Sequence, residues 1–77
     1  MNKERRKSLK KIIDQIDELK NRLEELQSDE EEYRDNMPDN LQGCERYEKA
    51  EAAVSNIEDA ISSLEDVICS IEEAIEQ

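Results

Sequence analysis

Several residue types on which protein chemistry depends are missing from this 77-residue chain or nearly so. It has no histidine, tryptophan or phenylalanine, one glycine and one proline. Without histidine, neither a histidine-based catalytic triad nor a histidine metal site can form, and a single glycine does not make a glycine-rich phosphate loop. We therefore expect no enzymatic activity, no cofactor and no bound metal.

Long apolar runs are also absent. No stretch approaches the roughly 18 apolar residues that indicate a transmembrane helix, and the basic start MNKERRKSLKK lacks the apolar segment of a signal peptide. The two cysteines, Cys44 and Cys69, do not form the pattern of a disulfide framework. These features predict a cytoplasmic protein.

Acidic charge is abundant and unevenly distributed. The formal net charge is −11, yet residues 1–11 hold six basic residues and one acidic residue. A surface this acidic repels DNA, RNA and anionic membranes, so we expect neither a nucleic-acid partner nor a membrane partner. It favours solubility, basic protein partners or mimicry of a polyanion.

Apolar residues recur at alternating spacings of three and four, the 3.5-residue period of coiled-coil helices. The first run is Leu9, Ile12, Ile16, Leu19, Leu23 and Leu26, followed after a break at Glu30 by Tyr33 and Met37. The second run is unbroken: Tyr47, Ala50, Val54, Ile57, Ile61, Leu64, Ile68, Ile71 and Ile75. The pattern predicts an all-α fold: a single antiparallel two-helix coiled-coil hairpin. Its helices are expected over about 3–35 and 44–76, with a connector over about 36–43.

The two runs suggest a register for this hairpin. Folding about residue 40 would place Leu23 opposite Ile57 and Leu19 opposite Ile61, although a shift by one heptad also aligns the rows. The basic start would then lie beside the acidic end of the chain. Such a charge cluster favours antiparallel over parallel pairing.

One flank of the second run is small and nearly uncharged. It suggests that two hairpins pack second helix against second helix as a homodimer, a four-helix bundle. The candidate oligomer face is Ala53, Ala60, Ser63, Val67 and Ala74. The alternative is that alanine is simply a good helix former on an exposed surface.

The stretch DNMPDNLQGCERYE, residues 35–48, holds the only proline and the only glycine. Tyrosine and arginine, residue types common in interface hot spots, gather around it. The candidate partner-binding residues at this turn are Tyr33, Arg34, Met37, Leu41, Arg46 and Tyr47. These side chains either close the end of the hairpin or bind another protein.

The stretches MNKERRKSLKK, NMPDNLQGCERYEKAE and LEDVICSIEEAIE together resemble a group of short hypothetical proteins from phages, prophages and conjugative elements of Firmicutes. The resemblance covers nearly the whole chain. It implies a genomic setting in a mobile element, without implying a mechanism.

Two functions are therefore expected as alternatives. The first is a non-enzymatic protein-interaction module, an oligomeric hairpin with an unknown protein partner. The second is a phage counter-defence protein. It would either mimic DNA charge to occupy a host nuclease or sequester a nucleotide signal at its basic end.

Overall fold

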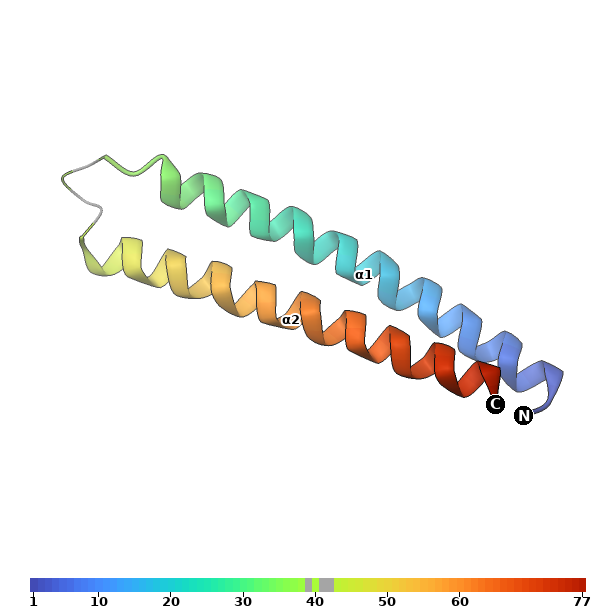
Figure 1. The fold of residues 1–77 in the computed structure, drawn as a ribbon. Helices are drawn as coiled ribbons and strands as arrows, with labels where there is room; N and C mark the ends of the chain where they lie inside the picture. The colour runs from blue at the N-terminus through green and yellow to red at the C-terminus, as the bar shows by residue number, and fades with distance from the viewer. Residues whose placement is uncertain (39, 41–42) are drawn as a thin grey trace.

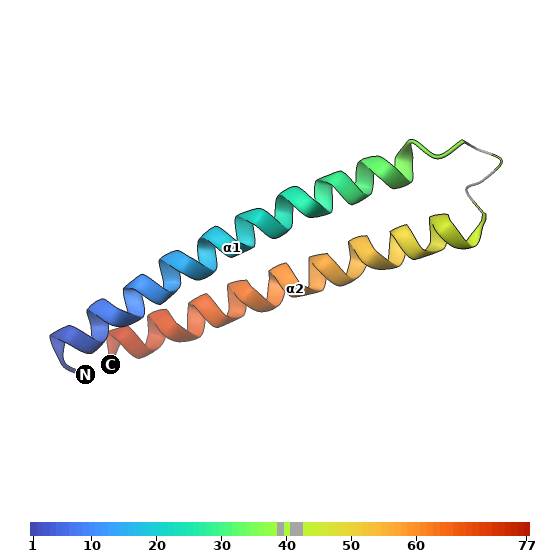
Figure 2. The same cartoon turned by 180° about the vertical axis from the view of Figure 1, so that it is seen from behind.

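Two long helices lie side by side and run in opposite directions, as Figures 1 and 2 show. This computed structural model describes residues 1–38, 40 and 43–77. Helix α1 spans Lys3–Asp35 and helix α2 spans Glu45–Glu76. The hairpin measures 60 × 15 × 12 Å, and both chain termini lie at the end opposite the turn (Figure 1). Neither helix is both long enough and apolar enough to cross a membrane.

The helix ends follow local sequence signals. Asn2 caps α1, because its side-chain oxygen accepts a hydrogen bond of 2.8 Å from the backbone N–H of Arg5. At the other end, the Asn36 N–H donates to the Glu32 carbonyl at 3.0 Å. Pro38 follows two residues later and disfavours helical backbone at the residue before it. Cys44 is the N-cap of α2 but makes no side-chain capping hydrogen bond.

The core is thin and runs along the seam between the helices. Ala50 and Ile61 of α2 are buried, together with Met37 at the turn. The rest of the predicted apolar row of α2 is half-buried: Tyr47, Val54, Ile57, Leu64, Ile68, Ile71 and Ile75. Helix α2 therefore presents the predicted row to its neighbour.

Helix α1 is rotated about its axis relative to the prediction. Leu9, Ile16 and Leu23 are half-buried as expected. The other half of the predicted seam is exposed: Ile12 at 42%, Leu19 at 50%, Leu26 at 58% and Tyr33 at 44%. Its place against α2 is taken by the half-buried residues Arg6, Ile13, Lys20, Gln27 and Arg34. The prediction that Ile12, Leu19, Leu26 and Tyr33 lie in the seam is wrong.

In this rotation, side chains of α1 make polar contacts with α2. The Lys20 ammonium lies 3.9 Å from the Glu65 carboxylate, and the Gln27 side-chain amide donates to the Glu58 carboxylate and to the Val54 carbonyl. Long side chains such as these also cover apolar surface with their methylene groups. The residue pairs 20–65 and 27–58 are each centred between residues 42 and 43, not on residue 40. The register therefore differs from the predicted one.

The basic start of α1 lies at the same end of the hairpin as the acidic end of α2 (Figure 1). Lys10 lines a shallow hollow together with Glu72 and Glu76. Within residues 1–38, 40 and 43–77, however, no ion pair joins residues 1–11 to the end of α2. The two charge clusters are neighbours without direct pairing.

Candidate interaction surfaces

A row of exposed apolar side chains runs along α1. Its members recur every seven residues and are Ile12, Leu19, Leu26 and Tyr33, each more than two-fifths exposed. In a helix, a seven-residue spacing returns to nearly the same face after about two turns. The four side chains therefore form one stripe along the length of α1.

Helix α2 carries a second row, which contains the residues of the predicted oligomer face. Val67 is 43% exposed, and Ala60 and Ser63 are also exposed. Ala53 and Ala74 are half-buried, partly covered within the hairpin. The structure thus leaves the middle of the predicted oligomer face open to solvent and covers part of each end.

Both rows lie on the same side of the hairpin. Lys20 and Gln27 of α1 reach Glu65 and Glu58 of α2 along one side of the helix pair, which we call the polar edge. Lys20 and Gln27 lie on one flank of the α1 surface that faces α2, and the exposed apolar row of α1 lies on the opposite flank. On α2, the two glutamates lie on one flank of the surface that faces α1, and the alanine-rich row lies on the opposite flank. We call the opposite side, formed by Ile12, Leu19, Leu26, Tyr33, Ala53, Ala60, Val67 and Ala74, the apolar face.

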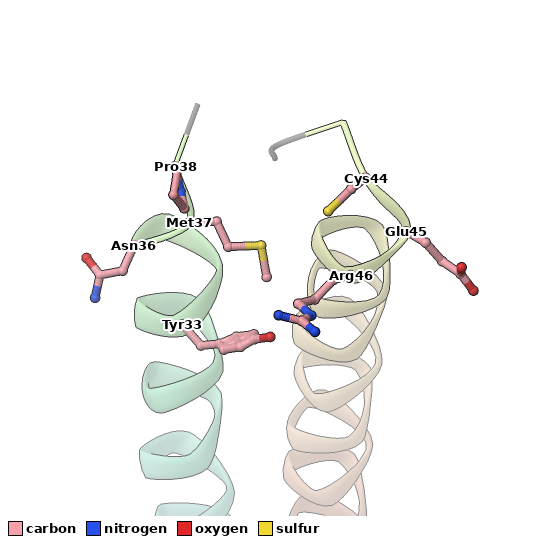
Figure 3. A pocket seen from close by; sticks show the side chains of 7 residues that line it. All are labelled: Tyr33, Asn36, Met37, Pro38, Cys44, Glu45 and Arg46. Carbon is pink, nitrogen blue, oxygen red and sulfur yellow. The ribbon is translucent and has the colours of Figure 1, made fainter. Parts of the chain in front are cut away.

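The turn end holds an open hollow of about 590 Å³. Its lining residues, drawn in Figure 3, are Tyr33, Asn36, Met37, Pro38, Cys44, Glu45 and Arg46. Met37 is buried and points across toward α2, whereas Asn36 and Glu45 point away from the hollow (Figure 3). Tyr33 and Arg46 extend toward one another from opposite helices and are both exposed.

The candidate turn residues therefore divide into two groups. Met37 and the half-buried Tyr47 help to close the hairpin, and Tyr33 and Arg46 remain accessible. Leu41 lies outside the residues that the structure describes. The division leaves one aromatic ring and one guanidinium available to a partner.

Arg34 is half-buried at the same end. Its Nε lies 3.0 Å from a carboxylate oxygen of Asp35. This hydrogen bond, more than any other effect, raises the pKa of Arg34 above its ordinary value, and the nearby Tyr47 and Glu31 act in the same direction. Arg34 is therefore a fixed cation that serves its own helix end.

The cysteines and the acidic side chains are the remaining groups that bear on reactive and metal-binding chemistry. Cys44 is half-buried, Cys69 is exposed, and both are free thiols. Among the described residues, no group of three or more cysteine, aspartate or glutamate side chains is arranged to hold a metal ion. The most prominent surface features of the described residues are the apolar face and the hollow at the turn.

Sequence reasoning missed the exposed row on α1, although a signal for it exists. The residues Arg6, Lys20, Gln27 and Arg34 recur in step with Ile13 on one flank of α1. The flank of α2 that meets them is Glu51, Glu58, Glu65 and Glu72. Matching these two polar rows predicts the polar edge, and with it the rotation of α1.

Known proteins add no assignment to these surfaces. No protein-family model matches the chain, and no curated protein or solved structure is significantly similar to it. The function must therefore be inferred from the chain's own geometry and charge.

Proposed function

We propose that this chain is a non-enzymatic protein-interaction module that self-associates through its apolar face, forming a four-helix bundle from two coiled-coil hairpins. The observation that supports this proposal is the exposed stripe of Ile12, Leu19, Leu26 and Tyr33. Contiguous apolar patches on soluble chains mark surfaces that bind other molecules. A second copy presents a matching stripe.

The thin core gives the energetic reason. Among the described residues only Met37, Ala50 and Ile61 are buried apolar residues. A single core in a chain of this size rarely contributes more than roughly 3–5 kcal/mol. Covering a large apolar side chain contributes about 1.5–3 kcal/mol when burial is complete. Self-association would therefore add stability that one hairpin lacks.

The turn is the proposed contact for another protein. Tyr33 and Arg46 are exposed there and belong to the residue types that dominate interface hot spots. We also propose a cytoplasmic location, supported by the sequence composition, and an origin in a mobile element, supported by the resemblance to short proteins of Firmicutes phages and conjugative elements. The Arg46→Ala variant should lose capture of a host partner while keeping its own oligomeric state. Unchanged capture would argue against a contact at the turn.

Sedimentation equilibrium at micromolar concentration tests self-association. The wild-type chain should sediment as a dimer, and the double variant Leu19→Glu/Leu26→Glu should be monomeric, because two charges per chain would be buried in the interface. Asn21→Glu/Ser28→Glu is the matched control, since both of these residues are exposed on α1 away from the stripe. A monomeric wild type, or a dimer in both variants, would contradict the proposal.

Charge mimicry is the second candidate, and the outer surface of α2 supports it. Exposed acidic doublets recur every seven residues, at 58–59, 65–66 and 72–73. At 1.5 Å per residue, the doublets lie roughly 10 Å apart along the helix. A ridge of this kind suits a DNA-binding enzyme. Co-purification of such an enzyme from host lysate, with release by salt, would support mimicry.

A further inference from the structure

We propose that the two hairpins of the dimer pack with both turns at the same end, so that α1 of each chain lies over α2 of its partner. This inference rests on the proposed self-association. It adds which helix meets which, and the apolar face alone does not determine that. It also gathers both turns, each with an exposed Arg46, at one end of the bundle, where a single protein can contact the two together.

Only two symmetric arrangements bring the same face of both hairpins together. Homodimers generally have a two-fold axis, and here that axis lies in the plane between the two faces. An axis along the hairpin puts both turns at one end, keeps every residue at its own height along the bundle and sets α1 over the partner's α2. An axis across the hairpin puts the turns at opposite ends and sets like helix over like helix.

The register within one hairpin determines which residues meet when both turns lie at the same end. Three pairs of residues define this register: Lys20 with Glu65, Gln27 with Glu58, and Ile13 with Glu72. The first two pairs are in contact, and the third lines one shallow hollow. In each pair the two residue numbers sum to 85. An axis along the hairpin preserves heights, so the same relation holds between α1 and the partner's α2.

The large row of α1 and the small row of α2 are in step with this register. The residues that lie at matching heights are Ile12 with Ala74, Leu19 with Val67, Leu26 with Ala60, and Tyr33 with Ala53. These pairs differ from the register by one residue, or about 1.5 Å along a helix. With both turns at the same end, each larger side chain of α1 therefore meets a smaller side chain of the partner's α2. Well-packed cores alternate large and small residues across facing positions in this way.

Turns at opposite ends give a poorer match of size. The row on α1 is centred between residues 22 and 23, so Leu19 would face the partner's Leu26. The row on α2 is centred between 63 and 64, so Ala60 would face the partner's Val67. The distance between two packed helices depends on the side chains at their contact. The two α1 helices would therefore need a wider spacing than the two α2 helices, and one face could not close evenly over both rows.

The residues that flank the two rows distinguish the arrangements by charge. Each lies three residues after one member of its row and four before the next, and all are exposed: Gln15, Arg22 and Asp29 on α1, and Asn56, Ser63 and Ser70 on α2. With turns at the same end, Arg22 lies beside the partner's Ser63, and Asp29 lies beside the partner's Asn56. Each charge then meets an uncharged polar group. With turns at opposite ends, the axis passes close to residue 22 and sets Arg22 beside the partner's Arg22, where like charges repel.

The remaining charge is compatible with turns at the same end. The acidic doublets of α2, at 58–59, 65–66 and 72–73, lie toward the polar edge and the outer surface, away from the partner. Residues 72–76 of α2 hold three acidic residues and lie at the height of the partner's residues 9–13, which hold two lysines. The acidic segment 29–35 of α1 lies beside the partner's residues 50–56, which hold one acidic residue. No two strongly acidic segments are set side by side.

Spin labels at the two ends of the hairpin test the orientation. In a Cys44→Ser/Cys69→Ser background, one variant carries a label on Asn36→Cys at the turn, and another on Gln77→Cys at the open end. Both positions are exposed C-caps. With turns at the same end, the two labels of each dimer should lie under about 30 Å apart, because helix axes in a bundle are about 8–10 Å apart. With turns at opposite ends, each label lies about 14 residues from the axis, which separates the pair by roughly 40 Å or more.

A label on Ser62→Cys is the matched control. Ser62 is exposed near the middle of α2, so its two labels stay within the width of the bundle in either arrangement. Distances of about 40 Å or more at Asn36→Cys and Gln77→Cys would overturn the orientation and leave self-association standing. The absence of any intermolecular distance at all three positions, together with a monomer in sedimentation, would overturn self-association and this inference with it.

Discussion

The two long sides of the hairpin differ in what they contribute. Along the polar edge, Lys20 and Gln27 reach across to α2 with an ion pair and hydrogen bonds. Along the apolar face, Leu19 and Leu26 remain half or more exposed. The hairpin thus pairs polar groups along one side and leaves a row of large apolar side chains exposed along the other.

The difference is unexpected, because the polar contacts contribute less free energy than burial of the apolar side chains would. Exposed ion pairs contribute about 0–1 kcal/mol, less than the burial of one leucine. The polar edge alone is therefore a weak reason to leave four large side chains in water. Under the proposed self-association, a second copy would cover the apolar face, and the polar groups on one side and the apolar groups on the other would both be satisfied in the same rotation of α1.

The largest expected effect comes from the seam that both sides share. Ile61→Ala removes the large side chain that is 5% exposed at the centre of α2. We expect the free energy of unfolding to fall by about 2–4 kcal/mol through lost burial and a residual cavity. Urea denaturation followed by circular dichroism measures this value. A loss below about 1 kcal/mol would show that Ile61 is not at the core.

Leu26→Ala tests the apolar face. We expect a loss of about 1.5–3 kcal/mol at concentrations where the dimer is populated, because the leucine is then covered. On dilution the loss should shrink, since Leu26 is 58% exposed in the single hairpin. Leu23→Ala is the control, and its cost should persist on dilution because Leu23 faces α2. Equal dilution behaviour in the two variants would remove the distinction between seam and face.

Cys44→Ser alters neither the polar edge nor the apolar face, so it provides a reference for a change in stability that is independent of both. Cys44 is an N-cap without a capping hydrogen bond, and serine is among the preferred N-cap residues. We expect a gain of about 0.5–1 kcal/mol in the free energy of unfolding, with the oligomeric state unchanged. Thermal unfolding monitored by circular dichroism measures the gain. A loss of stability would mean that the thiol has a role in the hollow at the turn.

The polar edge should give the smallest effect. A double-mutant cycle with Lys20→Met and Glu65→Gln should yield a coupling energy of about 0.2–1 kcal/mol, reduced by salt. Chemical denaturation of the four proteins at low and high salt provides the cycle. A coupling energy of several kcal/mol would reverse the comparison and make the polar edge the main source of stability.

The sequence predicts α2 more accurately than α1 for a physical reason. In α2 the residues flanking the apolar row are either uniformly acidic or small, so only one row is suited to the seam. In α1 two rows compete, one with Ile12 and Leu19 and one with Ile13 and Lys20. The periodicity of apolar residues compares the two rows only by their apolar content. It contains no information about Glu65, the partner that Lys20 contacts on α2.

The turn shows a similar division between local and tertiary information. Pro38 and Asn36 indicate from local chemistry where α1 ends, and the structure ends it at Asp35. Which side chains close the hairpin depends on contacts between helices. Met37 is buried there, whereas Tyr33 on the preceding turn of α1 stays exposed. Proximity in sequence does not separate these two roles.

The most direct test of the central claim is an isotope-filtered NMR experiment on a dimer mixed from methyl-labelled and unlabelled chains. If a second copy covers the apolar face, intermolecular NOEs will appear at the methyl groups of Leu19 and Leu26 and be absent at Leu23. Intermolecular NOEs at Leu23 without any at Leu19 or Leu26, or none at any methyl group, would contradict the account.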